Sequence, residues 1–309
     1  MDDGLSDRLA RRRQQMKQQQ MRRRRLLFGA GLVLVAAVAI FVVVSRSGDS
    51  HDGSGKEQVA AKPGGDGTGK TEPQTAGAQP DSSWKPDKGP VPILMYHVIG
   101  EPADGVTVPY PELYLSVDDF QAQVDWLEQN GYTAVTLVQV QDAWYDGGTL
   151  PGKPVVLSFD DGYLGQYTDA MPILREKGWA GQLNLKSEGS DLSSTEVKKM
   201  IKAGWEIASH TITHADLTTI SPDQLTDEVE GSRKELEKDL GVEIENFCYP
   251  AGVYNDEVVA AVEAAGYRGA TTVDPGLAER SEPFTLKRIR INRGDGADTL
   301  ASDLAGAGA

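Results

Sequence analysis

The chain is poor in cysteine: Cys248 is the only one among 309 residues. A single cysteine cannot close an intramolecular disulfide, so the cysteine count excludes a disulfide framework and does not identify the compartment. No repeat at a fixed period is visible, which argues against a repeat architecture. After residue 44, basic side chains are too few to balance the acidic ones. The formal net charge of the chain is −15 and the first 44 residues contribute +6, so the remainder carries −21. Such an acidic remainder argues against a nucleic-acid partner, which needs basic patches to neutralise phosphates.

Long apolar runs are also rare, with one exception near the N-terminus. Residues 26–44 read LLFGAGLVLVAAVAIFVVV, and at about 1.5 Å per residue they span roughly 28 Å, close to the hydrocarbon thickness of a bilayer. Basic residues precede this run, including Arg22 to Arg25, so the positive-inside rule keeps residues 1–25 as a cytoplasmic tail. A cleaved signal peptide is the alternative, but no Ala-x-Ala-like spacing follows Val44. We interpret residues 26–44 as a transmembrane signal anchor of a single-pass cell-membrane protein, with the remainder outside the cell.

Two further segments follow the predicted anchor. Residues 45–90 are rich in Gly, Ser, Pro, Asp, Lys and Gln, and such a composition cannot bury enough apolar surface to fold, so we expect a disordered linker. Residues 91–309 have ample apolar content and are predicted to form one globular domain. The composition does not indicate an oligomeric state.

The predicted domain alternates short apolar runs with amphipathic segments. The expected strands are Pro92 to Val98, Thr133 to Leu137, Pro154 to Phe159, Ala180 to Leu185, Trp205 to Ser209, Ile244 to Tyr249, Arg268 to Val273 and Leu286 to Ile291. The expected helices are Val117 to Asn130, Gln166 to Lys177, Ser194 to Ala203, Pro222 to Leu240 and Asn255 to Ala265. Each of these helices is followed by a glycine suited to a C-terminal cap. Frequent alternation of this kind predicts parallel βα units, either closed as a barrel or open as a doubly wound sheet.

Polar residues follow several of the predicted strands. His97 closes the run ILMY within the first, Asp160 and Asp161 follow the third, His210 follows the fifth and Pro250 follows the sixth. In parallel α/β folds the carboxyl ends of strands meet at one rim, where functional sites gather. We therefore expect these residues to lie together.

The residue types at this rim indicate metal-assisted hydrolysis. Asp161, His210 and His214 supply one carboxylate and two imidazoles, a three-ligand set that leaves positions open for water and substrate. Zinc is the leading candidate, and cobalt, nickel or iron(II) also suit these ligands. Asp160 is then free to act as a general base. His97 is the unassigned histidine of the predicted domain and becomes the candidate general acid.

Two of these motifs resemble a known family. Ser158-Phe159-Asp160-Asp161-Gly162 and His210-Thr211-Ile212-Thr213-His214 are similar to the first and second motifs of the polysaccharide deacetylases, carbohydrate esterase family 4 with the NodB-homology domain. The resemblance covers roughly residues 90–293. It implies a distorted, TIM-like (β/α) barrel with Asp160 as base and Asp161, His210 and His214 as metal ligands. It also implies removal of N-acetyl groups from N-acetylglucosamine polymers, with release of acetate.

The sequence departs from the family pattern at two places. The third motif usually reads Arg-x-Pro-x-Gly, whereas Cys248-Tyr249-Pro250-Ala251-Gly252 lacks the arginine that orients the base. The turn formed by Pro250 and Gly252 still lets the N–H of Ala251 serve in an oxyanion hole. The late Leu-x-His motif is absent too, since residues 286–293 read LKRIRINR. With the early His97, both departures resemble the biofilm poly-β-1,6-N-acetylglucosamine deacetylase branch, in which an early histidine can take the place of the acid.

Substrate contacts are less sharply indicated. Tyr163 and Tyr249 lie beside the motifs and could stack on sugar faces, although Tyr249 could equally be a core residue. The expected partner is an extracellular amino-sugar polysaccharide such as poly-N-acetylglucosamine, peptidoglycan or a chitin-like polymer. The alternatives are a metal amidase or esterase with another acylated substrate, or a surface glycan-binding protein of low activity.

Overall fold

The computed structural model describes residues 77–309 except Asp104. The predicted cytoplasmic tail, the predicted anchor at residues 26–44 and the linker up to residue 76 lie outside the described residues. Within residues 77–309, no helix combines the length and apolar character needed to cross a bilayer.

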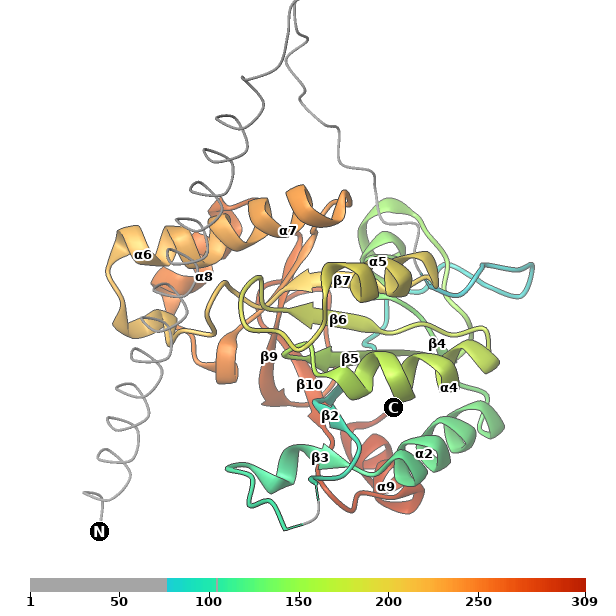
Figure 1. The fold of residues 1–309 in the computed structure, drawn as a ribbon. Helices are drawn as coiled ribbons and strands as arrows, with labels where there is room; N and C mark the ends of the chain where they lie inside the picture. Colours follow the sequence, from blue (N-terminus) through green and yellow to red (C-terminus); the bar gives the residue numbers. More distant parts are fainter. Residues whose placement is uncertain (1–76, 104) are drawn as a thin grey trace, which may run out of the picture. The chain divides into compact units, whose positions relative to one another are not determined.

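Seven parallel strands close into a barrel, in the order β1-β10-β9-β8-β7-β6-β5, with β5 pairing back onto β1 (Figure 1). Pairing of Leu94 with Leu157 closes the ring and excludes the open doubly wound sheet. The short strand β4 extends the sheet beside β5. Every predicted strand is present. The barrel strands are β1 (Ile93–Tyr96), β5 (Pro154–Asp160), β6 (Gln182–Leu185), β7 (Glu206–Ser209), β8 (Asn246–Cys248), β9 (Gly269–Pro275) and β10 (Leu286–Arg290), with β4 at Thr133–Ala134 and a separate pair formed by β2 (Val98–Ile99) and β3 (Tyr114–Leu115).

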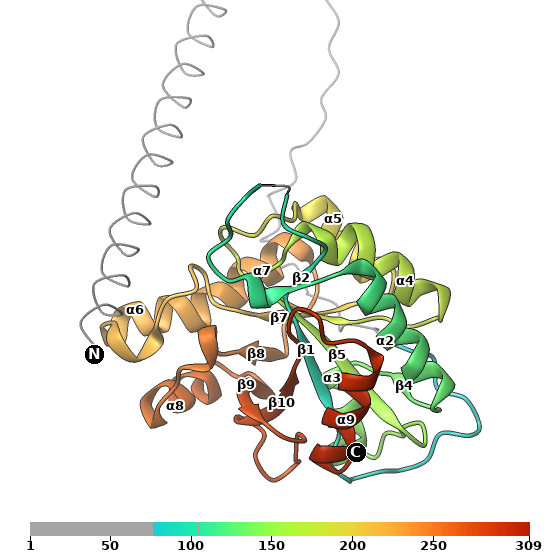
Figure 2. The same cartoon turned by 90° about the horizontal axis from the view of Figure 1, so that it is seen from below.

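Helices surround the strands, which occupy the centre of the view in Figure 2. All five predicted helices are present: α2 (Val117–Gln129), η3 (Gln166–Ala170) with α4 (Met171–Glu176), α5 (Ser194–Lys202), α6 (Pro222–Thr226) with η5 (Asp227–Gly231) and α7 (Ser232–Leu240), and α8 (Asp256–Ala264). Not predicted were α3 (Leu137–Gln141), η1 (Pro111–Leu113), η2 (Asp142–Asp146), η4 (Leu217–Thr219), η6 (Pro250–Gly252) and α9 (Ala297–Ala307).

Local sequence signals explain where the helices begin and end. The Ser193 side chain accepts a hydrogen bond from the N–H of Glu196, whose side chain caps Ser193 in return, so α5 begins with a capping box. A residue with left-handed backbone follows each predicted helix, as at Gly241 after α7, where φ is 79°. Glycine adopts this conformation without steric cost, and the predicted C-terminal caps are confirmed.

The folded unit begins earlier than predicted. Trp84 is buried in an apolar cluster with Trp144 and Leu150, and the backbone of Lys85 pairs with that of Leu150. Further along this segment, the N–H of Gly77 donates to the carbonyl of Gly204 over 2.7 Å. The prediction of a disordered linker up to residue 90 is therefore wrong for residues 77–90. Its polar composition concealed a single large side chain that anchors the segment.

A buried polar cluster lies at the amino end of the barrel strands. The carboxylate of Glu206, at the start of β7, accepts hydrogen bonds from the N–H of Val138 at 3.0 Å and from Asn246 at 2.8 Å. The side chain of Asn246 also exchanges hydrogen bonds with that of Gln141 from α3. Burial raises the pKa of Glu206 to about 7, and these two donors offset only part of that effect.

Replacing Glu206 with glutamine should change how stability depends on pH. The carboxyl group of the unfolded chain loses its proton near pH 4.3, whereas Glu206 in the fold keeps its proton up to about pH 7. The folded state therefore binds more protons in this window, and the free energy of unfolding falls as pH rises through it. Relative to Glu206→Gln, the free energy of unfolding of the unaltered chain should fall by roughly 3 kcal/mol between about pH 5 and pH 8.

Urea denaturation across this pH range measures the difference. The exposed residue Glu257 provides a control, since Glu257→Gln should leave the pH dependence unchanged. A constant difference between Glu206→Gln and the unaltered chain at every pH would contradict the assignment.

Candidate active site

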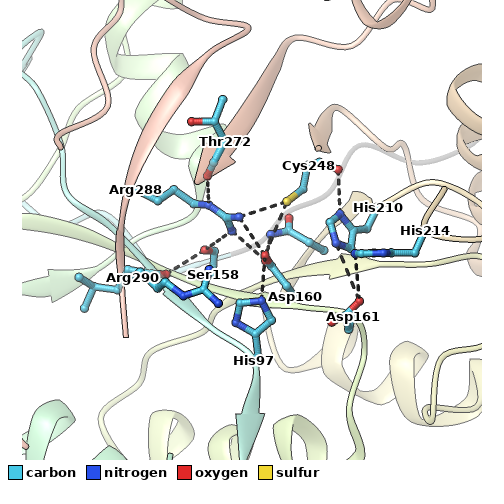
Figure 3. A network of polar contacts seen from close by, with 12 residues as sticks. His97, Ser158, Asp160, Asp161, His210, His214, Cys248, Thr272, Arg288 and Arg290 are labelled. Carbon is cyan, nitrogen blue, oxygen red and sulfur yellow. Dashed lines mark hydrogen bonds and ion pairs between the residues drawn. The ribbon is translucent and has the colours of Figure 1, made fainter. Parts of the chain in front are cut away.

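The predicted site residues meet at the carboxyl ends of the barrel strands (Figure 3). Asp160 is the last residue of β5, and His97 and His210 directly follow β1 and β7. The backbone of Asp161 turns sharply, with φ at 76°, so its carboxylate points away from that of Asp160. The two adjacent aspartates therefore face different partners.

Asp161 faces the two histidines of the second motif. Its Oδ1 atom lies 3.9 Å from Nε2 of His210 and 3.7 Å from Nε2 of His214. The Nδ1 atom of His210 is 2.8 Å from the carbonyl of Cys248, which fixes the tautomer and leaves Nε2 directed at Asp161. Burial and the neighbouring His210 lower the pKa of His214 to about 4, so its imidazole is neutral and available as a ligand.

These three residues fit a divalent metal. Their candidate ligand atoms all lie within 4.8 Å of one another, and two ligands at about 2.0–2.2 Å from one tetrahedral ion are themselves roughly 3.5 Å apart. One carboxylate and two imidazoles form the donor set expected for zinc and similar ions. Asp161, His210 and His214 are therefore the residues that we expect to hold a metal, although Asp160, His210 and Cys248 also lie close enough together to do so.

Asp160 is committed to a different set of partners. Its Oδ1 accepts from Asn184 at 2.6 Å and from Nη1 of Arg288 at 2.8 Å, and its Oδ2 accepts from Nη2 of Arg288 at 2.9 Å. Burial alone would raise the pKa of Asp160, but the charge and hydrogen bonds of Arg288 outweigh it and hold the pKa well below its usual range. Asp160 is thus an ionised, oriented carboxylate, as a base requires.

Arg288 supplies the arginine that the third motif lacks. It is fully buried on β10, and all five of its N–H donors have acceptors. Those acceptors are both Asp160 oxygens, the carbonyl of Thr272 at 2.6 Å, Oγ of Ser158 at 3.2 Å and Sγ of Cys248 at 3.4 Å. The third motif lacks its arginine, as the sequence shows, but a guanidinium still reaches Asp160 from a different strand.

A sequence signal for Arg288 existed in residues 286–293. Leu286 and Arg288 alternate with Ile289 and Ile291, and the two isoleucines belong to the core cluster that includes helix residues such as Leu300. Period-two alternation therefore places Arg288 on the opposite face, inside the barrel, where a buried guanidinium needs a carboxylate. Asn184 had no such signal, because its role depends on the register that pairs it with Asp160.

His97 lies beside Asp160, at a longer distance than Arg288 and Asn184. Its Nε2 atom is 3.8 Å from Oδ2 of Asp160, and the side chain is 12% exposed. Burial lowers the pKa of His97 and outweighs the opposite effect of the two aspartates, so the resting imidazole is neutral. Its buried Nδ1 has no hydrogen-bond partner among the described residues.

The remaining predicted residues divide between the surface and the core. Tyr163 is half-buried, and burial together with the carboxylate of Asp161 raises its pKa. Ala251 is exposed on a left-handed turn with φ at 52°, between buried Pro250 and half-buried Gly252. Tyr249 is fully buried and donates its hydroxyl to the carbonyl of Phe284. Of the two interpretations of Tyr249, the core residue is correct and sugar stacking is wrong, because the ring is enclosed.

The loop after β6, which the sequence did not single out, contacts both Asp161 and the loop that carries His210 and His214. Lys186, directly after β6, places its Nζ 3.2 Å from Oδ1 of Asp161. The N–H groups of Ser187 and Glu188 donate to the carbonyls of Thr211 and Ile212 in the histidine loop. The segment after β6 thus holds both the Asp161 turn and the histidine loop in place.

A closed parallel barrel carrying a carboxylate pair and a histidine pair at its rim defines a hydrolase of the deacetylase type, and comparisons with known proteins agree. A family model described as polysaccharide deacetylase matches residues 147–270. YxkH of Bacillus subtilis (strain 168), named for the polysaccharide deacetylases, is 33% identical over 222 residues, which cover 69% of this chain and 76% of that protein. The poly-beta-1,6-N-acetyl-D-glucosamine N-deacetylase of Escherichia coli (strain K12) is 38% identical over 96 residues, which cover 30% of this chain and 13% of that enzyme.

Solved structures give the same result. The Streptococcus pyogenes deacetylase PplD in complex with acetate aligns with a TM-score of 0.64 and 28% identity, covering 70% of this chain and 99% of that one. The chain belongs to the polysaccharide deacetylase family.

Replacing Arg288 with lysine tests the assignment of the buried guanidinium. Lysine keeps the charge but loses the planar fork that binds both carboxylate oxygens. We expect the free energy of unfolding to fall by about 2–3 kcal/mol. Because the pKa of Asp160 then rises, the acidic limb of the kcat/KM profile for acetate release should move to higher pH.

The matched control is Arg268→Lys, at a partly exposed arginine that pairs with Asp142 and Glu245. This change should lower the free energy of unfolding by less than about 1 kcal/mol and leave the pH profile of kcat/KM unchanged. An unmoved acidic limb in Arg288→Lys would show that Arg288 does not set the ionisation of Asp160.

Proposed function

We propose that this family member is a metal-dependent N-deacetylase that removes N-acetyl groups from N-acetylglucosamine-containing polysaccharide at the cell surface. The observation that carries the proposal is the division of the aspartate pair. Asp160 is bound by Arg288 and Asn184, whereas Asp161 faces the nitrogens of His210 and His214. A glycan-binding protein would need no oriented base beside a ligand set, so this geometry favours turnover over binding alone.

Each residue has a step in the proposed hydrolysis. Asp161, His210 and His214 would hold a divalent metal, with zinc the leading candidate, which would lower the pKa of water and polarise the acetyl carbonyl. Asp160 accepts a proton as the water oxygen attacks the carbonyl carbon. The N–H of Ala251 faces the oxygen on which negative charge develops. The carbon–nitrogen bond then breaks, and His97 gives a proton to the leaving nitrogen. The products are acetic acid and an amine, which ionise to acetate and an ammonium group.

Because its pKa is low, Asp160 keeps the proton from the attacking water only briefly. Arg288 favours the ionised carboxylate, so a proton taken by Asp160 passes readily to a stronger base. The neutral imidazole of His97, 3.8 Å away, is the nearby candidate to receive it. Such a relay explains how a histidine with a lowered pKa can still act as an acid.

The substrate class is proposed from a relative and the location from the sequence. The E. coli relative is named for poly-β-1,6-N-acetyl-D-glucosamine, which makes that polymer the first substrate to test. The apolar length of residues 26–44 and the basic residues before it support an anchored domain outside the membrane.

Acetate release by the purified full chain tests the proposed function. With divalent metal supplied, we expect acetate from β-1,6-linked N-acetylglucosamine oligomers, with β-1,4 oligomers and peptidoglycan fragments as the comparison substrates. Asp160→Asn should abolish release while metal content is unchanged, whereas His214→Ala should lose the metal.

Three outcomes would change the proposal. Release from another acylated compound alone would indicate a metal amidase or esterase instead. Binding of oligomers without release, by folded and metal-loaded protein, would indicate a glycan-binding protein. Equal loss of metal in Asp160→Asn and His214→Ala would refute the division between base and ligand.

His97→Ala tests the proposed acid. Loss of a general acid typically lowers turnover by about 10²–10⁴-fold, and we expect kcat to fall in that range while metal affinity stays unchanged. The measurements are steady-state acetate release and metal titration. Near-normal turnover would assign the acid to another group.

A further inference from the structure

The loop that carries both histidines has a strained backbone. Thr211 and His214 have φ values of 67° and 61°, in the left-handed region. Such conformations are unusual for residues other than glycine, above all for a β-branched threonine, and cost on the order of 1–3 kcal/mol each unless the surroundings hold them. The His210–His214 loop therefore depends on contacts outside itself.

Glu228 makes three of these contacts from a single side chain. Its Oε2 atom accepts the N–H groups of Ile212 and Thr213, each at 2.9 Å, and its Oε1 accepts the hydroxyl of Thr213 at 2.5 Å. The acceptor is a half-buried carboxylate, and hydrogen bonds to an ionised group are stronger than those between neutral groups. The middle of the loop is thus bound to a residue sixteen positions beyond Ile212.

The helix that presents Glu228 is irregular at this point. Glu228 lies in η5, a π-helical turn inserted between α6 and α7. Single π turns inside helices are rare and often occur at functional sites. Gly231 ends the turn, and a Cβ atom there would lie 3.4 Å from Cδ1 of Ile212, so the helix packs closely against the loop.

The opposite side of the loop is held by main-chain groups. The N–H groups of Ser187 and Glu188 donate to the carbonyls of Thr211 and Ile212 at 3.1 Å and 3.0 Å. Within the loop, the N–H of His214 donates to Oγ1 of Thr211 at 2.9 Å. Glu228 is the charged side chain in this set, and it supplies three hydrogen bonds between the loop and the helix.

We propose that Glu228 is a positioning residue for the metal site. It orders the loop so that Nε2 of His210 and Nε2 of His214 face Asp161 before a metal arrives, and it contacts neither metal nor substrate. This inference rests on the proposed metal site. Loss of partners behind metal ligands typically weakens affinity by about 10–100-fold.

Cobalt(II) titration of the full chain, followed by the d–d absorption of the bound ion, tests the inference. Glu228→Ala should raise the Kd for Co²⁺ by about 10–100-fold. Glu228→Gln should raise it by less than about fivefold, because the amide oxygen still accepts both N–H groups and the amide nitrogen can donate to Thr213. At saturating metal, Glu228→Ala should recover most of its kcat with an unchanged KM for the oligomer.

Glu230→Ala is the matched control. Glu230 lies on the same π turn but pairs with Lys234, so its loss should leave the Kd for Co²⁺ unchanged. A similar loss of affinity in Glu230→Ala and Glu228→Ala would assign the effect to the helix turn and overturn the proposal.

Other outcomes separate this inference from the proposed function. An unchanged Kd for Co²⁺ in folded Glu228→Ala would overturn the positioning role of Glu228. Should that variant fail to fold, a loss of Co²⁺ affinity of ten-fold or more in Glu228→Gln would overturn it instead. Absence of Co²⁺ binding by the unaltered chain would overturn the metal site and this inference together. Binding of Co²⁺ without acetate release would overturn the deacetylase proposal alone.

Discussion

The buried ion pair between Arg288 and Asp160 is the constraint around which the site is arranged. A carboxylate enclosed within a barrel is stable in its ionised form only when its charge and its acceptor sites are matched. Arg288 provides that match because each of its five donors has an acceptor, on β5, β8 and β9. The pair therefore links strands across the interior of the barrel and keeps the carboxylate of Asp160 ionised. Stability and chemistry depend on the same hydrogen bonds, so neither partner can change alone.

That pair also explains why two adjacent aspartates face different partners. Asp160 ends β5 with its side chain inside the barrel, where Arg288 and Asn184 occupy both of its oxygens. The left-handed turn at Asp161 sends the next carboxylate toward the histidines. In the proposed mechanism one carboxylate serves as a metal ligand, and the other serves as a base whose orientation its neighbours set. One strand end supplies both because the backbone turns between the two residues.

Much of this arrangement could be predicted from the sequence, and the failures have physical causes. Strands, helices and glycine caps follow from local patterns, and the rim of polar residues follows from parallel strand polarity. The partner of Asp160 could not be read locally, because Arg288 lies 128 residues away and reaches it only through barrel closure. Glu228 is similar: its role depends on a π turn that helical periodicity does not reveal. Trp84 was missed because composition averages hide one anchoring side chain in a polar segment.

Backbone strain in the described part of the chain is concentrated at the site. Among residues 77–309 other than Asp104, the non-glycine residues with positive φ are Asp161, Thr211, His214 and Ala251, and all four belong to the three motifs. Strained residues persist only where the surrounding structure determines their conformation. Main-chain groups after β6 bind the carbonyls of Thr211 and Ile212, and the carboxylate of Glu228 binds the N–H groups of Ile212 and Thr213. Lys186 pairs with Asp161. The unfavourable backbone conformations therefore lie at the residues of the proposed site, and the polar contacts around the rim stabilise them.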